Sequence, residues 1–387
     1  MALLLLAFLL PSLVTARCEC GYSVNKTTDA EHTVWTDLME TDFLHIDDVA
    51  NNSDGANNNI GWVPQVYNVT PALARGTYGK MALLENVVAN PLKNPWDWAG
   101  EATEAGTDAG LQLMVRSRPV DDMVPIGEIV AARTDMLYGS FRVAMKMTGV
   151  PGTCGAFFWF RNDTQEIDVE FLSKQLNASS NLVNLVLQSP QSAAAGYDAS
   201  HTPNYDVYPL PFRPDRAFHE YRFDWVSDRV SFYADGTWLK DMTIELPNSP
   251  GHLVLNHWSN GDALWSAGPP AQDATMTVSY VKAYFNSSDP QRQKDYSLRC
   301  AAAAAAGDNA TVCQIPNQTS PPDNQGPDAN RTARTFFFSD DPQDSVNQTV
   351  FDGWRNRNEG GGGPAVGWMK LAAGMAFASV MTVVGIA

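Results

Sequence analysis

The chain has 387 residues, of which 44% are hydrophobic, 10% aromatic and 18% charged, and its formal net charge is −17. This is the composition of a globular protein with a sizeable core, and the length allows one large domain or two ordinary ones. The acidic balance argues against nucleic acid as a partner, because such a protein needs basic patches to neutralise phosphates; a neutral or weakly charged substrate fits better.

The chain begins with a short apolar run, "MALLLLAFLLPSLVTARC". The run closes on Val14-Thr15-Ala16, and small residues at positions 14 and 16 suit a signal-peptidase site, although a basic start is missing. A buried N-terminal helix is the alternative. We expect residues 1–16 to be a signal peptide, because the run starts at Met1 and is short for a membrane span.

Short strand-like runs between turns fill the chain from about residue 34 to residue 286. No long segment repeats apolar residues at helical spacing, and the "ADG" at 234–236 indicates a hairpin. The pattern predicts an all-β sandwich or barrel in one domain, residues 17–290. The clearest runs are 111–118, 139–147, 155–160, 181–188, 220–225, 229–239, 252–258 and 274–285.

One of these runs carries acids in strict alternation. Residues 165–172 read "QEIDVEFL", so Glu166, Asp168 and Glu170 alternate with apolar residues. Alternation predicts a strand with one buried face, which places the carboxyl groups together on the other face. A solvated strand edge, where acids discourage aggregation, is the alternative.

Paired carboxyl groups are the machinery of retaining glycosidases, in which one acts as nucleophile and one as acid/base about 5–5.5 Å away. Glu166 and Glu170 have Cα atoms about 13 Å apart on a strand, and their long side chains can close most of that gap. Asp168 lies between them, where its shorter side chain can hydrogen-bond one Glu, and we expect its charge to keep the proton on one neighbour and so separate the two Glu pKa values.

After residue 290 the composition changes to Ala, Pro, Asn, Gln and Asp. We therefore expect residues 291–357 to be a flexible, glycosylated linker. The last part, 358–387, has small residues, a short spacer and an apolar tail, which is the layout of a glycosylphosphatidylinositol (GPI) anchor signal. A membrane helix is the alternative, but the apolar part is short for a span.

Cysteines and glycosylation triplets also indicate export. Asn-x-Ser/Thr triplets occur throughout, as at Asn162 and Asn177. Of the five cysteines, Cys300 and Cys313 flank a short Ala-rich loop and are the pair that we expect to be bridged. Cys18 and Cys20 are too close to bridge each other without strain, and one thiol is left over. No Cys/His cluster suggests a metal site, and we expect no cofactor.

Several motifs together resemble glycoside hydrolase family 16, whose members include lichenase-type β-glucanases, laminarinases and xyloglucan transglycosylases. "EIDVEF" matches its E-x-D-x-E signature. Four other segments agree with the family in order, and the resemblance covers roughly residues 30–286. These segments are "YGSFRVAMKM" (138–147), "AFHEYRFDW" (217–225), "VSFYADGTWL" (230–239) and "LVLNHWSNG" (253–261).

The resemblance implies a concanavalin A-like β-jelly roll of two antiparallel sheets. It also implies that Glu166 is the nucleophile, Asp168 the supporting acid and Glu170 the acid/base. The single residue between Asp168 and Glu170 is closer to the lichenase and transglycosylase types than to the laminarinase type. The N-terminal "CECGYSV" departs from the chitin–glucan transglycosylases, so the acceptor, water or sugar, stays open. The predicted signal peptide, linker and anchor resemble those of fungal cell-wall proteins.

Aromatic planes suit the apolar faces of sugars. Candidate sugar contacts are therefore Trp159, just before the acids, and Trp258 and Trp265, which flank a later loop. Asn256 and His257 could hydrogen-bond sugar hydroxyls. For each Trp alone, a place in the core is an equally good interpretation.

Three functions remain open at this point. The first is a retaining endo-β-glucanase acting on cell-wall β-glucan, β-1,3 or mixed-linkage. The second is a glucan transglycosylase that uses the same intermediate, and the third is a lectin-like glucan-binding protein without catalysis. In each case we expect a monomer at the cell surface, held to the membrane by the GPI anchor.

Overall fold

The computed structural model describes residues 18–49, 61–306, 312–322, 337–341 and 344–352. The predicted signal peptide and anchor signal lie outside these residues. Among the described residues, no helix combines the length and the apolar character that a membrane span requires.

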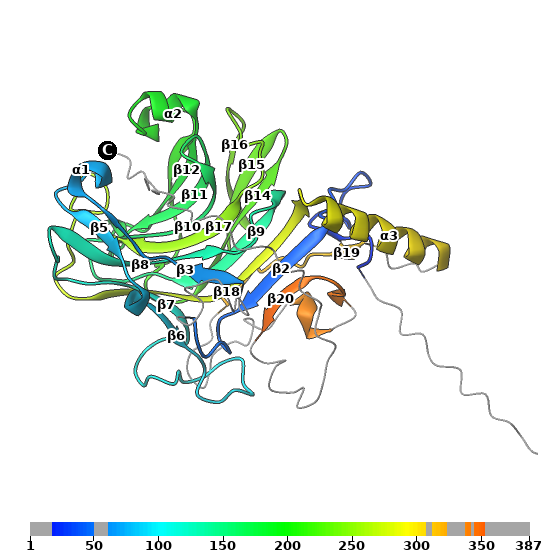
Figure 1. The fold of residues 1–387 in the computed structure, drawn as a ribbon, viewed down its shortest axis with the longest axis horizontal. Coiled ribbons are helices and arrows are strands. Elements are labelled where there is room, and N and C mark those ends of the chain that lie inside the picture. Colours follow the sequence, from blue (N-terminus) through cyan, green and yellow to red (C-terminus); the bar gives the residue numbers. More distant parts are fainter. Residues whose placement is uncertain (1–17, 50–60, 307–311, 323–336, 342–343, 353–387) are drawn as a thin grey trace, which may run out of the picture.

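Two large β-sheets form the body of the molecule (Figure 1). The first, here called the front sheet, has the strand order β13-β12-β11-β10-β17-β8-β5-β4, with β3 also paired to β8. Its strands are β3 (Trp62–Pro64), β4 (Tyr67–Val69), β5 (Gly79–Ala82), β8 (Met123–Ala131), β10 (Cys154–Asn162), β11 (Gln165–Leu172), β12 (Leu182–Gln188), β13 (Tyr205–Pro209) and β17 (His252–Trp258).

The second, here called the back sheet, has the order β16-β15-β14-β9-β18-β2-β20, with β7 on β18 and β6 on β7. Its strands are β2 (Asp37–Asp42), β6 (Val87–Asn90), β7 (Gly110–Val115), β9 (Met136–Lys146), β14 (His219–Val226), β15 (Arg229–Ala234), β16 (Thr237–Met242), β18 (Ala274–Ser287) and β20 (Thr349–Asp352). A small third sheet pairs β1 (Tyr22–Ser23) with β19 (Cys313–Gln314).

Most neighbouring strands run antiparallel; the described exceptions are β5 with β8, β2 with β20 and β1 with β19. The expected all-β jelly-roll sandwich is confirmed. In the described part of the chain helices are few: α1 (Pro71–Ala74), α2 (Pro190–Ala194) and α3 (Pro290–Ala306), with 3₁₀ turns at Leu84–Asn86, Ser173–Gln175, Ala199–His201 and Phe338–Asp340.

The main core lies between the sheets and fixes which side of each strand faces outward. Ile167 and Val169 of β11 point into this core together with Phe157 of β10 and Phe223 of the back sheet. Each large apolar side chain buried there contributes about 1.5–3 kcal/mol. Because side chains alternate along a strand, the residues between them must face away from the core.

The described part of residues 291–357 does not form the free linker that we expected. Residues 290–306 are the helix α3, β19 pairs with β1, and β20 extends the back sheet beside β2. Composition was a poor guide here because few apolar residues suffice to add a strand to an existing edge. Outside the strands, Ile315 packs against Leu38 and Phe337 packs against Tyr280, and both are buried.

The expected Cys300–Cys313 disulfide is wrong. Cys313 is bonded to Cys18, and Cys300 is bonded to Cys20. The two bridges tie the N-terminal segment to α3 and to β19. Cys18 and Cys20, two residues apart, are therefore bonded to different elements. The cysteine without a disulfide is Cys154, which is buried.

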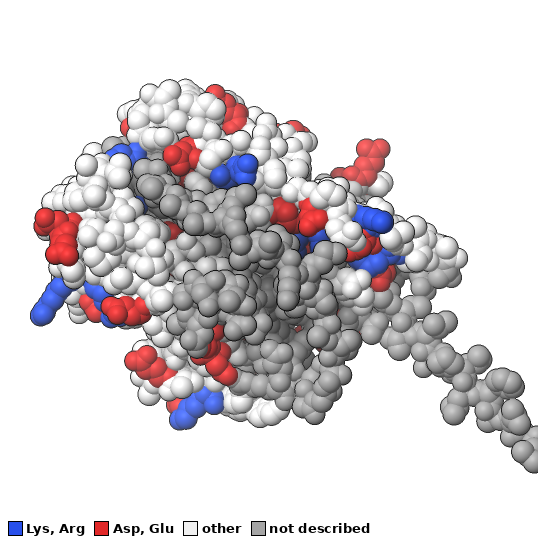
Figure 2. All heavy atoms as spheres, in the orientation of Figure 1, with Lys and Arg blue, Asp and Glu red and all other residues white. Residues whose placement is uncertain are grey.

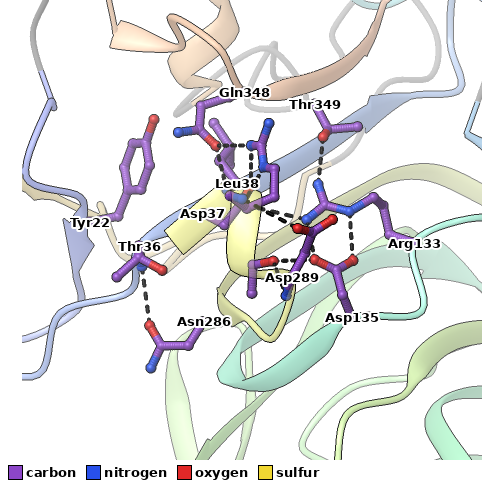
Figure 3. Close-up of polar contacts among 12 residues, drawn as sticks. Tyr22, Thr36, Asp37, Leu38, Arg133, Asp135, Asn286, Asp289, Gln348 and Thr349 are labelled. Carbon is purple, nitrogen blue, oxygen red and sulfur yellow. Dashed lines mark hydrogen bonds and ion pairs between the residues drawn. The ribbon is translucent and has the colours of Figure 1, made fainter. Parts of the chain in front are cut away.

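A polar cluster attaches α3 and β20 to the sandwich (Figure 3). Arg292 of α3 donates two hydrogen bonds of 2.7 Å to the carboxylate of Asp37 in β2. Arg133 donates to Asp135 at 2.7 Å and to the hydroxyl of Thr349 at 2.7 Å. Although burial opposes the change, the hydrogen bond from Arg133 lowers the pKa of Asp135. These contacts make the C-terminal elements part of the domain.

Figure 2 shows how charge is distributed on one face. Among the described residues of that face, Lys and Arg side chains lie singly or beside Asp and Glu, between larger uncharged areas.

Candidate active site

The acidic strand is β11, an interior strand of the front sheet between β10 and β12. Glu166, Asp168 and Glu170 lie on its outer face, opposite the core residues, and only 5%, 4% and 5% of each is exposed. Acids that only protected an edge would be solvated. The interior position and the burial therefore contradict the alternative of a solvated edge.

The outer face around the acids is apolar. It contains Phe158 and Ala156 of β10, Val186 of β12 and Val254 of β17, all buried in one cluster with Trp258 and Trp265. The register sets Phe158 beside Asp168 and Ala156 beside Glu170. Small and apolar neighbours leave the carboxyl groups with few polar partners, which disfavours their charged forms.

Burial dominates the protonation of the three acids. It raises the pKa of Glu166 to about 7 and the pKa of Glu170 to about 8. It also raises the pKa of Asp168 well above its usual range, and the negative charges of the two glutamates add to that rise. The pKa order makes Glu166 the first of the two glutamates to ionise.

A hydrogen bond between Asp168 and Glu166 reinforces this order. The bond lowers the pKa of Glu166 and raises that of Asp168, so Asp168 holds the proton and donates it to the Glu166 carboxylate. We expect Asp168 both to hydrogen-bond one glutamate and to act through its charge. Burial and the charges of the two glutamates raise the pKa of Asp168, which favours its neutral form, the form that can donate a hydrogen bond.

Three of the five predicted sugar contacts lie on the acid face. Asn256 of β17 is in register with Ala156, next to Glu170 across the sheet. Its amide nitrogen donates to Glu128 at 3.3 Å, and its amide oxygen is buried without a partner. The indole nitrogen of Trp258 is likewise buried without a hydrogen-bond partner, whereas the indole of Trp265 reaches Glu170 and lowers the pKa of its carboxyl group. The amide oxygen of Asn256 and the indole nitrogen of Trp258 remain available to a polar ligand.

Trp159 and His257 do not belong to the site. Trp159 is in register with Ile167 and packs against Trp225 in the core, with ring centroids 4.5 Å apart. His257 is 1% exposed; its ring nitrogens contact the carbonyl of Leu113 and the hydroxyl of Thr153. Both predictions were wrong because these stretches are apolar on both faces, so alternation could not assign the face.

Three polar residues that were not predicted lie on the same side of the sheet: Tyr67, Lys80 and Glu128. Glu128 of β8 is in register with Asn256 and accepts a 2.9 Å hydrogen bond from the hydroxyl of Tyr67. Lys80 of β5 is 1% exposed, and its ammonium group lies 4.5 Å from the ring centroid of Trp258.

Burial raises the pKa of Glu128 and lowers that of Lys80 to about 8, each opposed by the other's charge. Glu128 alternates with apolar residues in "MVPIGEIVA", a signal that could have found it. Lys80 follows Gly79 in a short strand and carries no such signal.

Within the described ranges, no group of three or more His, Cys, Asp or Glu side chains is arranged to hold a metal ion. The acids of β11 interact with one another and with their neighbours on the sheet, so the chemistry that they support is proton transfer and nucleophilic attack by carboxylate.

Part of the chain resembles a known protein family. Residues 93–282 match the family described as "Glycosyl hydrolases family 16", and this part of the chain belongs to glycoside hydrolase family 16. It is 25% identical over 167 residues to a beta-glucanase of Paenibacillus polymyxa, which is 42% of this chain and 64% of that protein. It is 26% identical over 159 residues to a beta-glucanase of Bacillus subtilis strain 168, 40% of this chain and 60% of that protein.

These matches thus span less than two thirds of the relatives' length. A solved structure, a prokaryotic beta-1,3-1,4-glucanase (lichenase) from a mouse hindgut metagenome, is 19% identical with a TM-score of 0.46. The alignment covers 64% of this chain and 98% of that one.

Proposed function

We propose that the protein is a retaining endo-β-glucanase. It cleaves internal bonds of β-1,3 or mixed-linkage glucan of the cell wall. The observation that carries the proposal is the acidic strand: two buried glutamates of different pKa flank a protonated aspartate on one face of β11. Family membership and the named beta-glucanase relatives support the substrate class.

The proposed reaction has two displacements. In the first, a Glu166 carboxylate oxygen bonds to the anomeric carbon while the glycosidic bond breaks, and Glu170 gives its proton to the leaving oxygen. In the second, Glu170 takes a proton from the incoming hydroxyl, whose oxygen bonds to the anomeric carbon as the bond to Glu166 breaks. Asp168 keeps its proton throughout and stabilises the Glu166 carboxylate as it leaves.

The test is substitution of the nucleophile. Glu166→Gln should lower release of reducing sugar from β-1,3 or mixed-linkage glucan by more than about 10³-fold, while circular dichroism stays unchanged. Glu101→Gln is the matched control, since the Glu101 side chain is 79% exposed and lies outside the strands of both sheets. Full activity of Glu166→Gln would refute the proposal, and an initial product of inverted anomeric configuration would refute retention.

Transglycosylation is the second candidate, and the burial of the acids favours it. Carboxyl groups that are only 4–5% exposed meet little bulk water, so a bound sugar hydroxyl can compete as acceptor. Incubation with glucan and a fluorescently labelled oligosaccharide separates the two reactions. Labelled products longer than the acceptor indicate transfer, and shortening of glucan without labelled products indicates hydrolysis.

A lectin-like protein would give a third result. Glucan would bind and remain intact, and Glu166→Gln would not change the affinity. The raised and separated pKa values of Glu166 and Glu170 support catalysis over this alternative, since simple sugar binding does not require them.

We further propose that the protein is exported and held at the cell surface by the predicted anchor. The disulfides Cys18–Cys313 and Cys20–Cys300 support export, because such bonds persist in oxidising compartments. Release of the protein from intact cells by a phosphatidylinositol-specific phospholipase tests the anchor. A protein that stays in the cytoplasm contradicts the proposal.

A further inference from the structure

Cys154 is the one cysteine that neither disulfide uses, and it lies at the start of β10 on the acid face. Its neighbours in register are Leu172 on β11 and Trp258 on β17. The residue is fully buried, and its Sγ atom lies 3.5 Å from Oε1 of Glu170. A thiol in this position touches the carboxyl group to which the proposed function assigns the proton transfers.

We propose that Cys154 is a positioning residue that holds Glu170 in one orientation through both of its protonation states. This inference rests on the proposed function. A thiol can donate its S–H hydrogen and can also accept a hydrogen at sulfur, each weakly. Glu170 must lose its proton in the first displacement and regain it in the second. Cys154 can donate to the ionised carboxylate and accept from the protonated acid without any change of rotamer.

The surroundings keep the thiol in its protonated form. Burial raises the pKa of Cys154 well above its usual range, and the negative charge of Glu170 raises it further. The thiolate is the reactive form of cysteine, so Cys154 is inert as a nucleophile and serves as a neutral hydrogen-bonding group. The alternative is that Cys154 acts only as a small apolar residue filling space under Trp258.

The thiol is one of several groups that act on Glu170. Burial is the largest influence and raises the pKa of Glu170, the charge of Glu166 raises it further, and the Cys154 hydrogen bond opposes the rise. Removal of the thiol hydrogen should therefore raise the pKa of Glu170 further. The titratable groups that face Glu170 are Glu166 and Asp168 on its own strand, Cys154 on β10, Lys80 on β5 and Tyr205 on β13.

The first test needs no catalytic activity. Cys154 is the sole thiol of the chain once both disulfides have formed, so the infrared S–H stretching band reports on it alone. We expect the band of the full chain to move as Glu170 titrates and to lose that pH dependence in Glu170→Gln. The inference is overturned if the position of the band does not change with pH in the wild type, or if it still changes with pH in Glu170→Gln.

The second test uses kcat/KM against pH on soluble β-glucan. Cys154→Val fills similar space without a donor and should move the alkaline limb to higher pH by about 0.5 unit, with a loss in maximal rate of about fivefold. Cys154→Ser keeps a donor and should restore most of both changes. Val183→Ala, a core truncation on β12, is the matched control and should lower Tm without moving the limb.

Equal profiles for Cys154→Val and Cys154→Ser would show that Cys154 only fills space, and an unshifted limb in both variants would also overturn the inference. Failure of the proposed function looks different. In that case the wild type cleaves no glucan at any pH, and the infrared band alone decides whether the thiol is coupled to Glu170.

Discussion

Asp168 lies two residues after Glu166 on the same face of β11, and hydrogen bonding between the two carboxyl groups lowers the pKa of Glu166 and raises that of Asp168. The bond exists because the site is buried, and a buried carboxyl group between two others retains its proton. The neighbouring Glu166 can then be ionised, because its carboxylate accepts a hydrogen bond from the neutral Asp168. Crowding of three acids thus produces one ionised group, one neutral donor and one acid of higher pKa.

The first prediction concerns that donor. Asp168→Asn should keep much of the activity, because a side-chain amide can donate to Glu166 as the carboxylic acid does. Asp168→Ala should lower kcat about 10²-fold or more, since the Glu166 carboxylate then loses its donor. Steady-state kinetics on soluble β-glucan measures both variants. Equal losses in Asn and Ala would show that Asp168 acts through its charge.

The second prediction is a narrow pH optimum. Activity requires Glu166 ionised and Glu170 protonated, so kcat/KM should rise with pH through about 7 and fall through about 8. Because the two carboxyl groups interact, these values belong to the pair. Initial rates from pH 4 to pH 10 measure the profile, and maximal activity at pH 4 would contradict the assignment.

The third prediction concerns stability. The folded-state pKa of Glu170 is raised to about 8, above the usual range of an unfolded glutamate, so the folded protein binds the extra proton between those values. The free energy of unfolding therefore falls as pH rises from about 4.5 to 8.

Glu170→Gln should weaken this dependence, and the raised pKa values of Glu166 and Asp168 account for the part that remains. At pH 8 the variant's free energy of unfolding should exceed that of the wild type by on the order of 1–3 kcal/mol, so it should unfold at a higher temperature. Thermal melts of both proteins at pH 5 and pH 8 measure the effect, with Glu101→Gln as the control. A wild type whose stability increased over that range would contradict the prediction.

The fourth prediction concerns the disulfides. Cys20→Ser should release the N-terminal segment from α3 and cost about 2–5 kcal/mol of stability. Mass spectrometry of unreduced peptides should find Cys18 joined to Cys313 and Cys20 joined to Cys300. Cys154→Ser should leave both linkages intact, and a peptide pair joining Cys300 to Cys313 would contradict the structure.

The fifth prediction separates the two kinds of tryptophan. Trp159→Phe removes a core contact with Trp225 and the indole hydrogen bond to the carbonyl of Met136, so it should lower Tm. Its KM for glucan should change little. Trp258→Phe removes an unpartnered indole N–H from the acid face and should raise KM several-fold. Melting curves and KM values for both variants make the comparison, and a larger KM change in Trp159→Phe would reverse the assignment.

The sequence by itself determined the strand content and the shared face of Glu166, Asp168 and Glu170. Both depend on the two-residue period of a strand, which short-range alternation of acids and apolar residues displays directly. The resemblance to a known family rested on the same local motifs, and it carried the prediction of a two-sheet jelly roll to the correct result.

Only the tertiary structure decided the rest. Trp159 and His257 lie in strands that are apolar on both sides, so their faces follow from register with β11 and not from their own sequence. The disulfides join residues 295 and 280 positions apart, a distance at which sequence spacing carries no information. The protonation of Asp168 and the contact between Cys154 and Glu170 depend on burial, and burial exists only after the sheets have packed.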